Sequence, residues 1–501
     1  IRCISTHKKF LMNSKMWTPG QAVKEFARLR PEEVVLICAN EGGEDKLTRL
    51  ELDTWSDWLA HKLIERGVRQ GDCVAIIFPT CIQHVVATIG TYKAGGTPMP
   101  ISYRMPPAER DAFLELANPK SVLSSAPELS DIVVSDMPDF SAYPKELTET
   151  NVPKPTKVLA SGGSTGKPKL IISSGAFQYP AGEHPLAQLL QLEPDDMLFS
   201  PGPLYHNGPF FFTQIALFHG CRAMLNERFH ASRTLDLIEN FRPTVLNLVP
   251  TMMQRMLRES DFIDRDLSSI RTAWHLAAPC PEWAKIGFIE RFGADAVMEL
   301  WAATEMTGLT TISGSEWLTH RGSVGKGLLT EFKILDEERN ELPIGEVGEI
   351  FSRFGNAPPD YDYLGASKLE ITSDHFASVG DLGHLDQEGY LYLADRRTDM
   401  IISGGANIFP AEIEAVLSSH KKVRDVAVIG LLDEDLGRKV WAVVQPEDTL
   451  DPPNVVELES LCQNQLALYK VPRGFELVAD FPRNDAGKIR RLALREERDS
   501  R

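Results

Sequence analysis

The sequence lacks the features that mark membrane-spanning, disulfide-stapled and metal-cluster proteins. No uninterrupted apolar run approaches the roughly 20 residues that a membrane-spanning helix needs. Its seven cysteines include no CxxC pair, and this odd count favours reduced thiols over a disulfide framework. The cysteines and the 12 histidines show no spacing typical of metal ligands. We therefore expect a cytoplasmic protein without a membrane span or a His/Cys metal site.

Basic residues are in the minority. Lys and Arg number 53 against 70 Asp and Glu, which gives a formal net charge of −17. A chain with this charge repels phosphate backbones, so nucleic acid is not expected as its main partner. Residues 1–16 contain bases and no acids, and we expect a ragged or tag-derived start there rather than a transit segment.

What is present is the composition of a globular protein long enough for two or three core-forming units. Hydrophobic residues make up 43% of the 501 residues and charged residues 25%, which excludes disordered and low-complexity classes. Helical periodicity alternates with short apolar runs, a pattern that predicts a layered α/β architecture with a largely parallel sheet. We expect helices over 52–67, 82–93, 235–241 and 252–259, and strands over 73–77, 157–160 and 244–248.

The pattern changes after Gly389. A strand over 390–394 is followed by a dense charged turn at 395–399, and then by about a hundred residues that predict a small α+β domain. We expect a large N-terminal domain over 1–394, a hinge over 395–399 and a C-terminal domain over 400–501. The expected elements of this last domain are helices over 410–418 and 455–468, and strands over 423–430, 439–445 and 474–478.

The most informative stretch is rich in glycine and hydroxyl residues and follows a predicted strand. It runs Ser161, Gly162, Gly163, Ser164, Thr165, Gly166, Lys167, Pro168 and Lys169. Backbone amides and hydroxyl groups in such a loop can surround phosphate oxygens. It is not a Walker A loop, because Ser161 stands at the position of its first glycine and Pro168 replaces the hydroxyl residue that would hold magnesium.

The loop resembles the signature of the adenylate-forming superfamily, which includes acyl-CoA synthetases, peptide-synthetase adenylation domains and luciferases. Gly162 stands where that family usually has Ser, and Leu170 where it usually has Gly. Four further segments resemble family motifs in the family's order, and agreement of five ordered segments by chance is far less probable than homology. These segments are Glu299–Glu305, Gly380–Gly383, the hinge within Asp395–Glu414, and Pro482–Lys488.

The resemblance implies an ATP site. It assigns Ser161 to Lys169 to the β- and γ-phosphates, Thr304 to the α-phosphate and Glu305 to Mg²⁺, a cation that prefers carboxylate oxygen. The ribose hydroxyls would be bound by Asp381, with Arg396 assisting. Trp301 and Ala302 would lie at the adenine, in place of the family's usual Tyr and Gly, and Ala278 lies in a segment that resembles the adenine-side loop with Ala for Gly.

The resemblance also implies a mobile C-terminal domain. Lys488 would bridge the substrate carboxylate and the α-phosphate in the transition state of adenylation. Rotation about the hinge, at Arg397 and Thr398, would then present a different face for the second step. Thr398 stands at a position where the family usually has Asp or Lys. Rotation about the hinge is still expected despite this difference.

The activated acid is expected to be something other than an amino acid. Tyr205, His206, Phe210 and Phe211 belong to a segment that resembles the lining of the family's acyl pocket, although two of the phenylalanines at 210–212 are equally explained as the start of a core helix. His206 would lie near the carboxylate. No Asp begins the segment to hold an α-amino group, and the aromatic run favours a roomy apolar cavity.

Over its length the chain resembles bile-acid-CoA-ligase-type members and stand-alone amide bond synthetases. Its partners are then a bulky, aryl or polycyclic acid, ATP, and either CoA or an amine that attacks the acyl-adenylate directly. The segments Ser403–Asn407 and Gly437–Lys439 fit a CoA arm and its phosphate, or equally a structural turn and a solvated basic pair. A catalytically silent binder and a luciferase-type oxygenase stay open as alternatives, and so does a homodimer.

Overall fold

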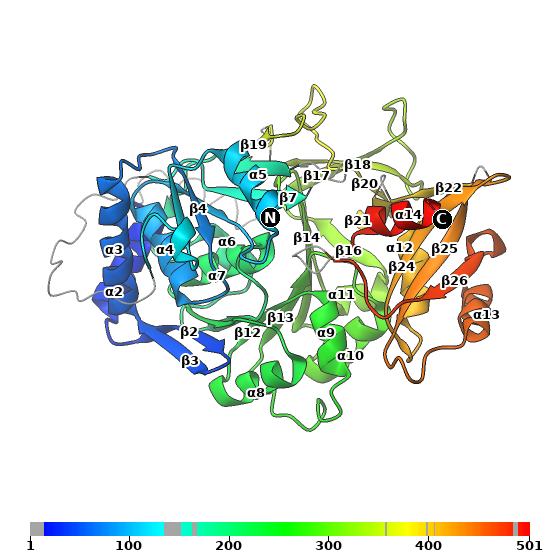
Figure 1. Cartoon of the computed structure of the whole chain (residues 1–501), viewed down its shortest axis with the longest axis horizontal. Helices are drawn as coiled ribbons and strands as arrows, with labels where there is room; N and C mark the ends of the chain where they lie inside the picture. Colours follow the sequence, from blue (N-terminus) through cyan, green and yellow to red (C-terminus); the bar gives the residue numbers. More distant parts are fainter. Residues whose placement is uncertain are drawn as a thin grey trace. The chain divides into compact units, whose positions relative to one another are not determined.

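The computed structural model of the chain describes residues 15–134, 152–162, 168–355, 358–396, 399–404, 406–483 and 489–500, with the backbone alone described at 161, 162, 168, 395 and 396. Figure 1 shows the helices and strands of the chain, with colours that follow the sequence. By packing, the chain divides into two compact units. The first comprises residues 1–276, 295–298 and 360–368, and the second comprises residues 277–294, 299–359 and 369–501.

The first unit has a mainly parallel sheet in the order β3-β2-β11-β10-β12-β13. Within it the contacts from β2 to β13 are parallel, and only the β2–β3 hairpin is antiparallel. The strands are β2 (Val34–Asn40), β3 (Gly43–Thr48), β10 (Met197–Ser200), β11 (Arg222–Asn226), β12 (Val245–Leu248) and β13 (Thr272–Leu276).

Smaller sheets complete the first unit. A parallel sheet has the order β5-β4-β6, an antiparallel sheet the order β19-β8-β7, and β1 pairs with β9. Their bounds are β1 (Met16–Trp17), β4 (Cys73–Ile77), β5 (Thr97–Pro100), β6 (Ser121–Ser124), β7 (Lys157–Gly162), β8 (Pro168–Ser173), β9 (Tyr179–Pro180) and β19 (Tyr361–Leu364).

The helices of the first unit follow local signals in the sequence. Capping boxes of Thr18 with Gln21 and of Thr48 with Glu51 begin α2 and α3. Gly220, with φ of 92°, ends α7, because glycine adopts this left-handed backbone at little cost. The helices are α2 (Pro19–Leu29), α3 (Arg49–Glu65), α4 (Ile82–Lys93), α5 (Pro107–Ala117), α6 (Pro185–Leu189), α7 (Asn207–His219), α8 (Ala231–Phe241) and α9 (Pro250–Leu257).

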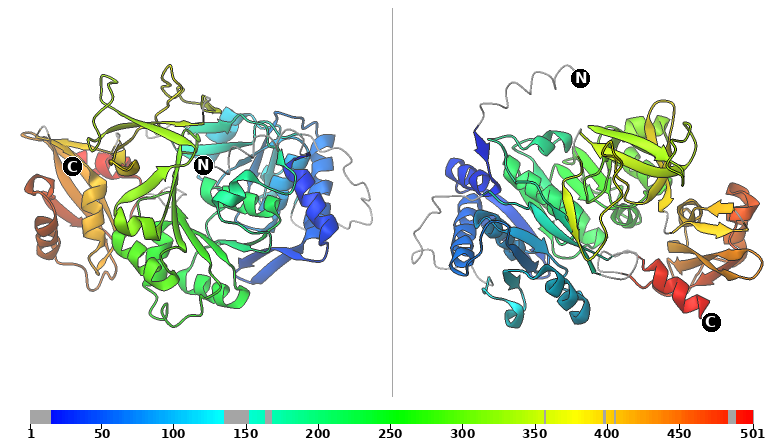
Figure 2. Two further views of the ribbon diagram at one scale, coloured as in Figure 1. Left: turned by 180° about the vertical axis from the view of Figure 1, so that it is seen from behind. Right: turned by 90° about the horizontal axis from the view of Figure 1, so that it is seen from above.

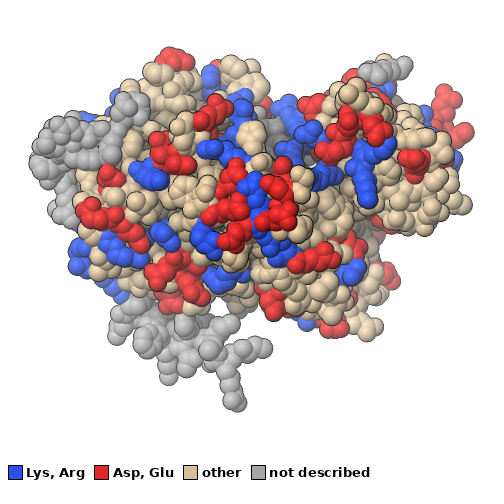
Figure 3. All heavy atoms as spheres, turned by 90° about the horizontal axis from the view of Figure 1, so that it is seen from below, with Lys and Arg blue, Asp and Glu red and all other residues tan. Residues whose placement is uncertain are grey.

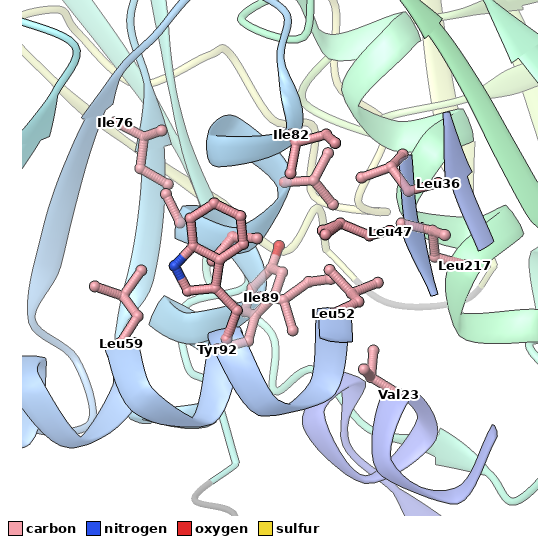
Figure 4. Packing of buried hydrophobic residues seen from close by; sticks show 14 of the residues in the cluster. Val23, Leu36, Leu47, Leu52, Leu59, Ile76, Ile82, Ile89, Tyr92 and Leu217 are labelled. Carbon is pink, nitrogen blue, oxygen red and sulfur yellow. The ribbon is translucent and has the colours of Figure 1, made fainter. Parts of the chain in front are cut away.

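Strand β4 joins two hydrophobic cores because its side chains alternate between its faces. Val74 and Ile76 belong to the cluster that also includes buried residues of α2, α3, α4, β2 and α7 (Figure 4). Ala75 and Ile77 pack on the other side with Phe113 of α5 and with residues of β7 and β8. The β7–β8 hairpin is thereby fixed to the core of the first unit.

The second unit has a sheet in the order β14-β15-β16-β21-β20-β18-β17. Its contacts from β15 to β17 are antiparallel, so the expected parallel sheet is confirmed for the first unit alone. The elements are β14 (Val297–Ala302), whose first two residues belong to the first unit, β15 (Leu309–Ser313), β16 (Ser323–Gly327), β17 (Thr330–Leu335), β18 (Gly348–Phe354), β20 (Asp381–Leu385), β21 (Tyr390–Arg396), α10 (Glu282–Phe292) and α11 (Gly314–Thr319).

The C-terminal part has the small α+β fold that the sequence predicts. Sheet β24-β25-β26, drawn in orange and red in Figure 2, carries α12 and α13 on one face and α14 on the other. Alternate residues of β24 belong to two separate cores. The elements are β22 (Ile401–Ser403), β23 (Ala406–Ile408), α12 (Pro410–Ser418), β24 (Val423–Asp433), β25 (Gly437–Pro446), α13 (Val455–Gln465), β26 (Gly474–Leu477) and α14 (Arg491–Asp499).

Acidic and basic side chains are mixed over the face drawn in Figure 3, which shows a gathering of acidic groups around basic ones near its centre. Within the described ranges, no helix is both long and apolar enough to cross a membrane. The six cysteines of those ranges, from Cys38 to Cys462, are free thiols.

Candidate active site

The predicted phosphate segment joins two paired strands. In the β7–β8 hairpin Ser161 lies opposite Lys169, and Gly162 lies opposite Pro168. The Lys169 ammonium lies 3.9 Å from the centre of the Tyr363 ring in β19, so the structure places this predicted phosphate ligand against an aromatic face. The expected ligands Gly163, Ser164, Thr165, Gly166 and Lys167 lie outside the described residues.

The predicted adenine and magnesium residues lie at the end of β14. Trp301 packs beside Phe332 with 6.0 Å between ring centres and keeps part of its surface accessible. Ala302 is exposed and closes the strand, and Thr304 and Glu305 follow directly. The Glu305 side chain is 8% exposed, and a carboxylate so withdrawn from water needs cationic or hydrogen-bonding partners.

The two predicted ribose residues are brought together by strand pairing. Asp381 begins β20 and lies directly opposite Arg396, at the end of β21. Gly380 precedes Asp381 with φ of 88°, a conformation that favours glycine, which explains the Gly-Asp order of the motif. Strand β21 continues through Asp395 and Arg396, so the expected turn at 395 begins later, because both residues pair with β20.

Two residues of the nucleotide segments have an unusual backbone. Ala277, beside the predicted adenine-side residue Ala278, has φ of 76°, and Met306, next to Glu305, has φ of 53°. Side chains with a Cβ are disfavoured in this left-handed region, by roughly 1 kcal/mol or more per residue. Ala277 therefore keeps the backbone that glycine usually provides, although it lacks glycine's freedom.

Lys488 and the hinge residues Arg397 and Thr398 lie outside the described residues. The chain on either side of 484–488 is held firmly: Arg483 and Ile489 form an antiparallel bridge, and the Arg490 amide donates to the Pro482 carbonyl at 2.8 Å. The Arg483 guanidinium also pairs with Asp425 at 2.6 Å. The two ends of the predicted lysine segment are thus anchored to β24.

The predicted acid-pocket residues lie at the start of α7. Tyr205 and His206 form an edge-to-face pair with ring centres 4.7 Å apart, and His206 is the residue that precedes the helix. Phe210 is buried and lies beside His84 in the core, whereas Phe211 is half-buried. Phe212 is fully buried, so the core interpretation holds for Phe210 and Phe212.

Sequence reasoning missed Lys157. This first residue of β7 is 9% exposed, and its ammonium donates to the Asn207 side-chain oxygen at 2.6 Å and lies 5.3 Å from the Phe211 ring centre. Burial lowers the pKa of Lys157 from 10.5 to about 8. A lysine at the start of an otherwise apolar strand was the signal that could have pointed to it.

The residues present fit ATP and Mg²⁺. Mg²⁺ is commonly held by one or two carboxylates together with substrate phosphates, and Glu305 offers one withdrawn carboxylate. The described residues contain no group of three or more His, Cys, Asp or Glu side chains able to hold a metal by themselves. A cation here would therefore depend on the nucleotide for its remaining ligands.

Comparison with known proteins decides the family. A model of the AMP-binding enzymes matches residues 23–357, and a model of the AMP-binding enzyme C-terminal domain matches residues 412–488. The chain belongs to the AMP-binding enzyme family. The resemblance found in the five sequence motifs is thereby confirmed, together with the adenylate-forming fold.

Relatives of this AMP-binding enzyme include CoA ligases. It is 27% identical to a 2-succinylbenzoate–CoA ligase of Bacillus licheniformis over 97% of this chain and 100% of that protein. It is 30% identical to an indoleacetate–CoA ligase of Aromatoleum aromaticum, over 90% of this chain and 93% of that protein.

Solved structures agree with the fold. An o-succinylbenzoate CoA synthetase of Bacillus subtilis in complex with its acyl-adenylate OSB-AMP has a TM-score of 0.81, 26% identity, and coverage of 96% of this chain and 98% of that chain. The same enzyme with ATP and a magnesium ion has a TM-score of 0.79 at 26% identity, covering 96% and 100%. The amide bond synthetase McbA of Marinactinospora thermotolerans, at 23% identity and a TM-score of 0.72 over 95% and 99%, shares the fold.

The enzyme is therefore an adenylate-forming ligase that uses ATP and Mg²⁺, and CoA is the co-substrate of its ligase relatives. Its general reaction is ATP-dependent activation of an acid followed by acyl transfer.

Proposed function

We propose that the enzyme converts a bulky aryl or polycyclic acid, other than an amino acid, into its acyl-AMP and then its CoA thioester. In the first step a carboxylate oxygen attacks the α-phosphorus of ATP and pyrophosphate leaves. In the second step the CoA sulfur attacks the acyl carbon, the bond to the AMP oxygen breaks, and AMP leaves. No oxidant or reductant is needed.

The observation that carries this proposal is the aromatic, partly accessible start of α7. Tyr205 and His206 directly precede α7 and Phe211 lies within it; all three are partly exposed, and they present ring surfaces suited to a flat apolar acid. No Asp begins this segment, so an α-amino group would lack the counter-ion that amino-acid-activating relatives provide. The two CoA ligases described above act on aromatic acids, 2-succinylbenzoate and indoleacetate, which agrees with this surface.

The roles of the remaining residues follow the family resemblance and are part of the proposal. We assign Ser161 to Lys169 to the β- and γ-phosphates, Glu305 to Mg²⁺, and Thr304 to the α-phosphate. Asp381 and Arg396, which pair across β20 and β21, would hold the ribose. Trp301 would stack on adenine, and Lys488 would neutralise charge as the carboxylate attacks.

The domain boundary, the hinge at Arg397 and Thr398, the cytoplasmic location and a homodimer stay predictions. The two compact units divide the chain differently from the expected 1–394 and 400–501, since they follow packing within one conformation. A hinge shows itself in the change between two conformations.

A product assay tests the proposed function. The enzyme is supplied with ATP, Mg²⁺ and a panel of aryl, polycyclic and medium-chain acids, each with CoA, with an amine, and with neither, and products are separated by chromatography. We expect acyl-CoA and AMP from aryl or polycyclic acids in the presence of CoA. Amide formed without CoA would instead identify an amide synthetase, and thioesters of medium-chain acids alone would contradict the proposed acid class.

A further inference from the structure

The buried lysine at the start of β7 has no described counter-ion. Among the described residues no Asp or Glu oxygen lies within 4.0 Å of the Lys157 ammonium, and its side-chain hydrogen bond goes to the neutral Asn207. Lys93, also a buried lysine of the first unit, differs: its ammonium contacts both Asp53 and Asp57 at 2.5 Å. Within the described part of the chain, Lys157 is therefore a buried cation without a neighbouring carboxylate.

Burying the Lys157 ammonium without a neighbouring negative charge costs free energy. Desolvation alone accounts for the lowered pKa of Lys157, and no neighbouring carboxylate raises it again. At neutral pH the group remains largely an ammonium ion, with three N–H donors and one acceptor in Asn207. Such a cost is expected where a bound group supplies the missing negative charge.

The surroundings of Lys157 are the accessible side of α7. Asn207 and Phe211, the two contacts of its ammonium, lie four residues apart and so share one helix face. Both are partly accessible, as are the neighbouring Tyr205 and His206, whereas α7 is buried from Phe212 to His219. The cation therefore lies beside the segment where the proposed function seats the acid.

We propose that Lys157 is a specificity residue that binds a second acidic group, a carboxylate, on the acid substrate. The inference rests on the proposed function for the position of the acid, and it adds that the preferred substrate is a dicarboxylic aryl or polycyclic acid. Asn207 orients the ammonium, Phe211 supports the ring that carries the second carboxylate, and the first carboxylate stays available for the attack on ATP.

A purely structural role for Lys157 makes a different prediction. If the amine merely holds β7 to α7 through Asn207, its loss would weaken the binding of all acids alike or would lower the stability of the fold. The two roles are therefore distinguished by the ratio between the binding constant of a dicarboxylic acid and that of its monocarboxylic parent. Benzoate can be compared with phthalate, isophthalate and terephthalate, and 2-naphthoate with naphthalene-2,6-dicarboxylate, so that the separation between the carboxylates also varies.

The test measures binding of these acids by titration calorimetry without ATP, together with kcat/KM for pyrophosphate release. The variants are Lys157→Met, which keeps chain length without charge, Lys157→Arg, which keeps charge, and Lys62→Met as the control for loss of a lysine. Lys62 is a suitable control because it lies on α3 and pairs with the exposed Glu65. Thermal unfolding confirms that each variant is folded.

In the wild type we expect at least one dicarboxylate to bind at least tenfold more tightly than its parent acid. Lys157→Met should reduce that ratio to about one, Lys157→Arg should retain part of it, and Lys62→Met should leave it unchanged. Equal binding of both acids by the wild type, or an unchanged ratio in Lys157→Met, would overturn the inference. Because binding is measured without ATP, failure of the proposed CoA ligation would appear separately, in the product assay.

Discussion

Ala277, beside the predicted adenine site, has an unfavourable backbone conformation. Its φ of 76° is one that an alanine adopts unfavourably, while the adjacent Ala278 has no such constraint. Strain of this kind is tolerated where surrounding structure fixes the backbone.

Replacing Ala277 by glycine should stabilise the protein. We expect Ala277→Gly to raise the free energy of unfolding by about 0.5–1 kcal/mol, because relief of the strained φ outweighs the added entropy of the unfolded chain. Ala278→Gly, the matched control, should instead lower stability by a similar amount. Urea unfolding of both variants measures the difference, and equal effects of the two changes would contradict the strain interpretation.

The role proposed for Lys488 is confined to the first of the two half-reactions, the formation of acyl-adenylate. We expect Lys488→Ala to slow acyl-adenylate formation by roughly 100-fold or more, since a charge that acts on the developing transition state is lost. The reaction of supplied acyl-adenylate with its acceptor should change little. Single-turnover measurements of each step check this, with Lys422→Ala, a surface lysine paired with Asp451, as the control. Equal losses in both steps would disprove the assigned role.

At the scale of elements, a buried ion pair ties α10 to β14. Lys285 is fully buried, and its ammonium contacts the Glu299 carboxylate at 2.5 Å, two residues before Trp301. The Lys285 ammonium also lies 4.7 Å from the Trp317 ring centre in α11. This pair fixes the strand that carries the predicted adenine and magnesium residues.

Removing one partner of this pair should be far more damaging than removing both. Lys285→Met leaves a buried carboxylate without its cation and should cost about 3–5 kcal/mol of stability, whereas Lys285→Met with Glu299→Leu should recover much of that loss. Chemical denaturation of the single and double variants gives the coupling energy between the two side chains. A double variant as unstable as the sum of its singles would show that the pair is not coupled.

Helix α4 contains a group that makes stability depend on pH. Burial lowers the pKa of His84 from 6.5 to about 3, so the native state keeps this imidazole neutral while the unfolded chain protonates it below pH 6.5. Because the unfolded state then binds more protons, stability falls as pH falls from about 6.5 toward 3.

Replacing His84 should remove that dependence. At pH 5 the contribution lost by the wild type amounts to about 2 kcal/mol relative to pH 7. We expect His84→Leu to show a correspondingly shallower loss of stability between pH 7 and pH 5 in urea unfolding. Parallel pH profiles for wild type and variant would exclude His84 as the responsible group. His61, exposed to a greater degree on α3, provides the control variant His61→Leu.

The helices and strands show which features of the fold could be predicted from sequence patterns. Helical periodicity predicted the bounds of α4 and α12 as the structure has them, whereas α8 begins at Ala231, four residues before the predicted start, because its first turn is too polar to show an apolar period. The antiparallel sheet of the second unit was not predicted, since strand direction depends on pairing between distant segments. The buried position of Lys157 was missed for the same reason: its ammonium contacts Asn207, 50 residues away.

At the scale of the whole molecule, the predicted site residues are shared between the two compact units. Lys169 and the residues around His206 belong to the first, and Glu305, Asp381 and Trp301 belong to the second. Ordered motifs in the sequence were sufficient to predict the family and the adenylate-forming fold. They do not give side-chain packing, which is why the burial of Phe210 and the strained backbone of Ala277 required the structure.

The central claim is that this enzyme activates an acid at the α-phosphate of ATP. Exchange of labelled pyrophosphate into ATP, measured with Mg²⁺ and an aryl acid in the absence of CoA and amine, tests it most directly. The account predicts exchange that requires the acid and that is lost by roughly 100-fold or more in Lys488→Ala. Acid-dependent formation of ADP and orthophosphate, without any exchange, would contradict it.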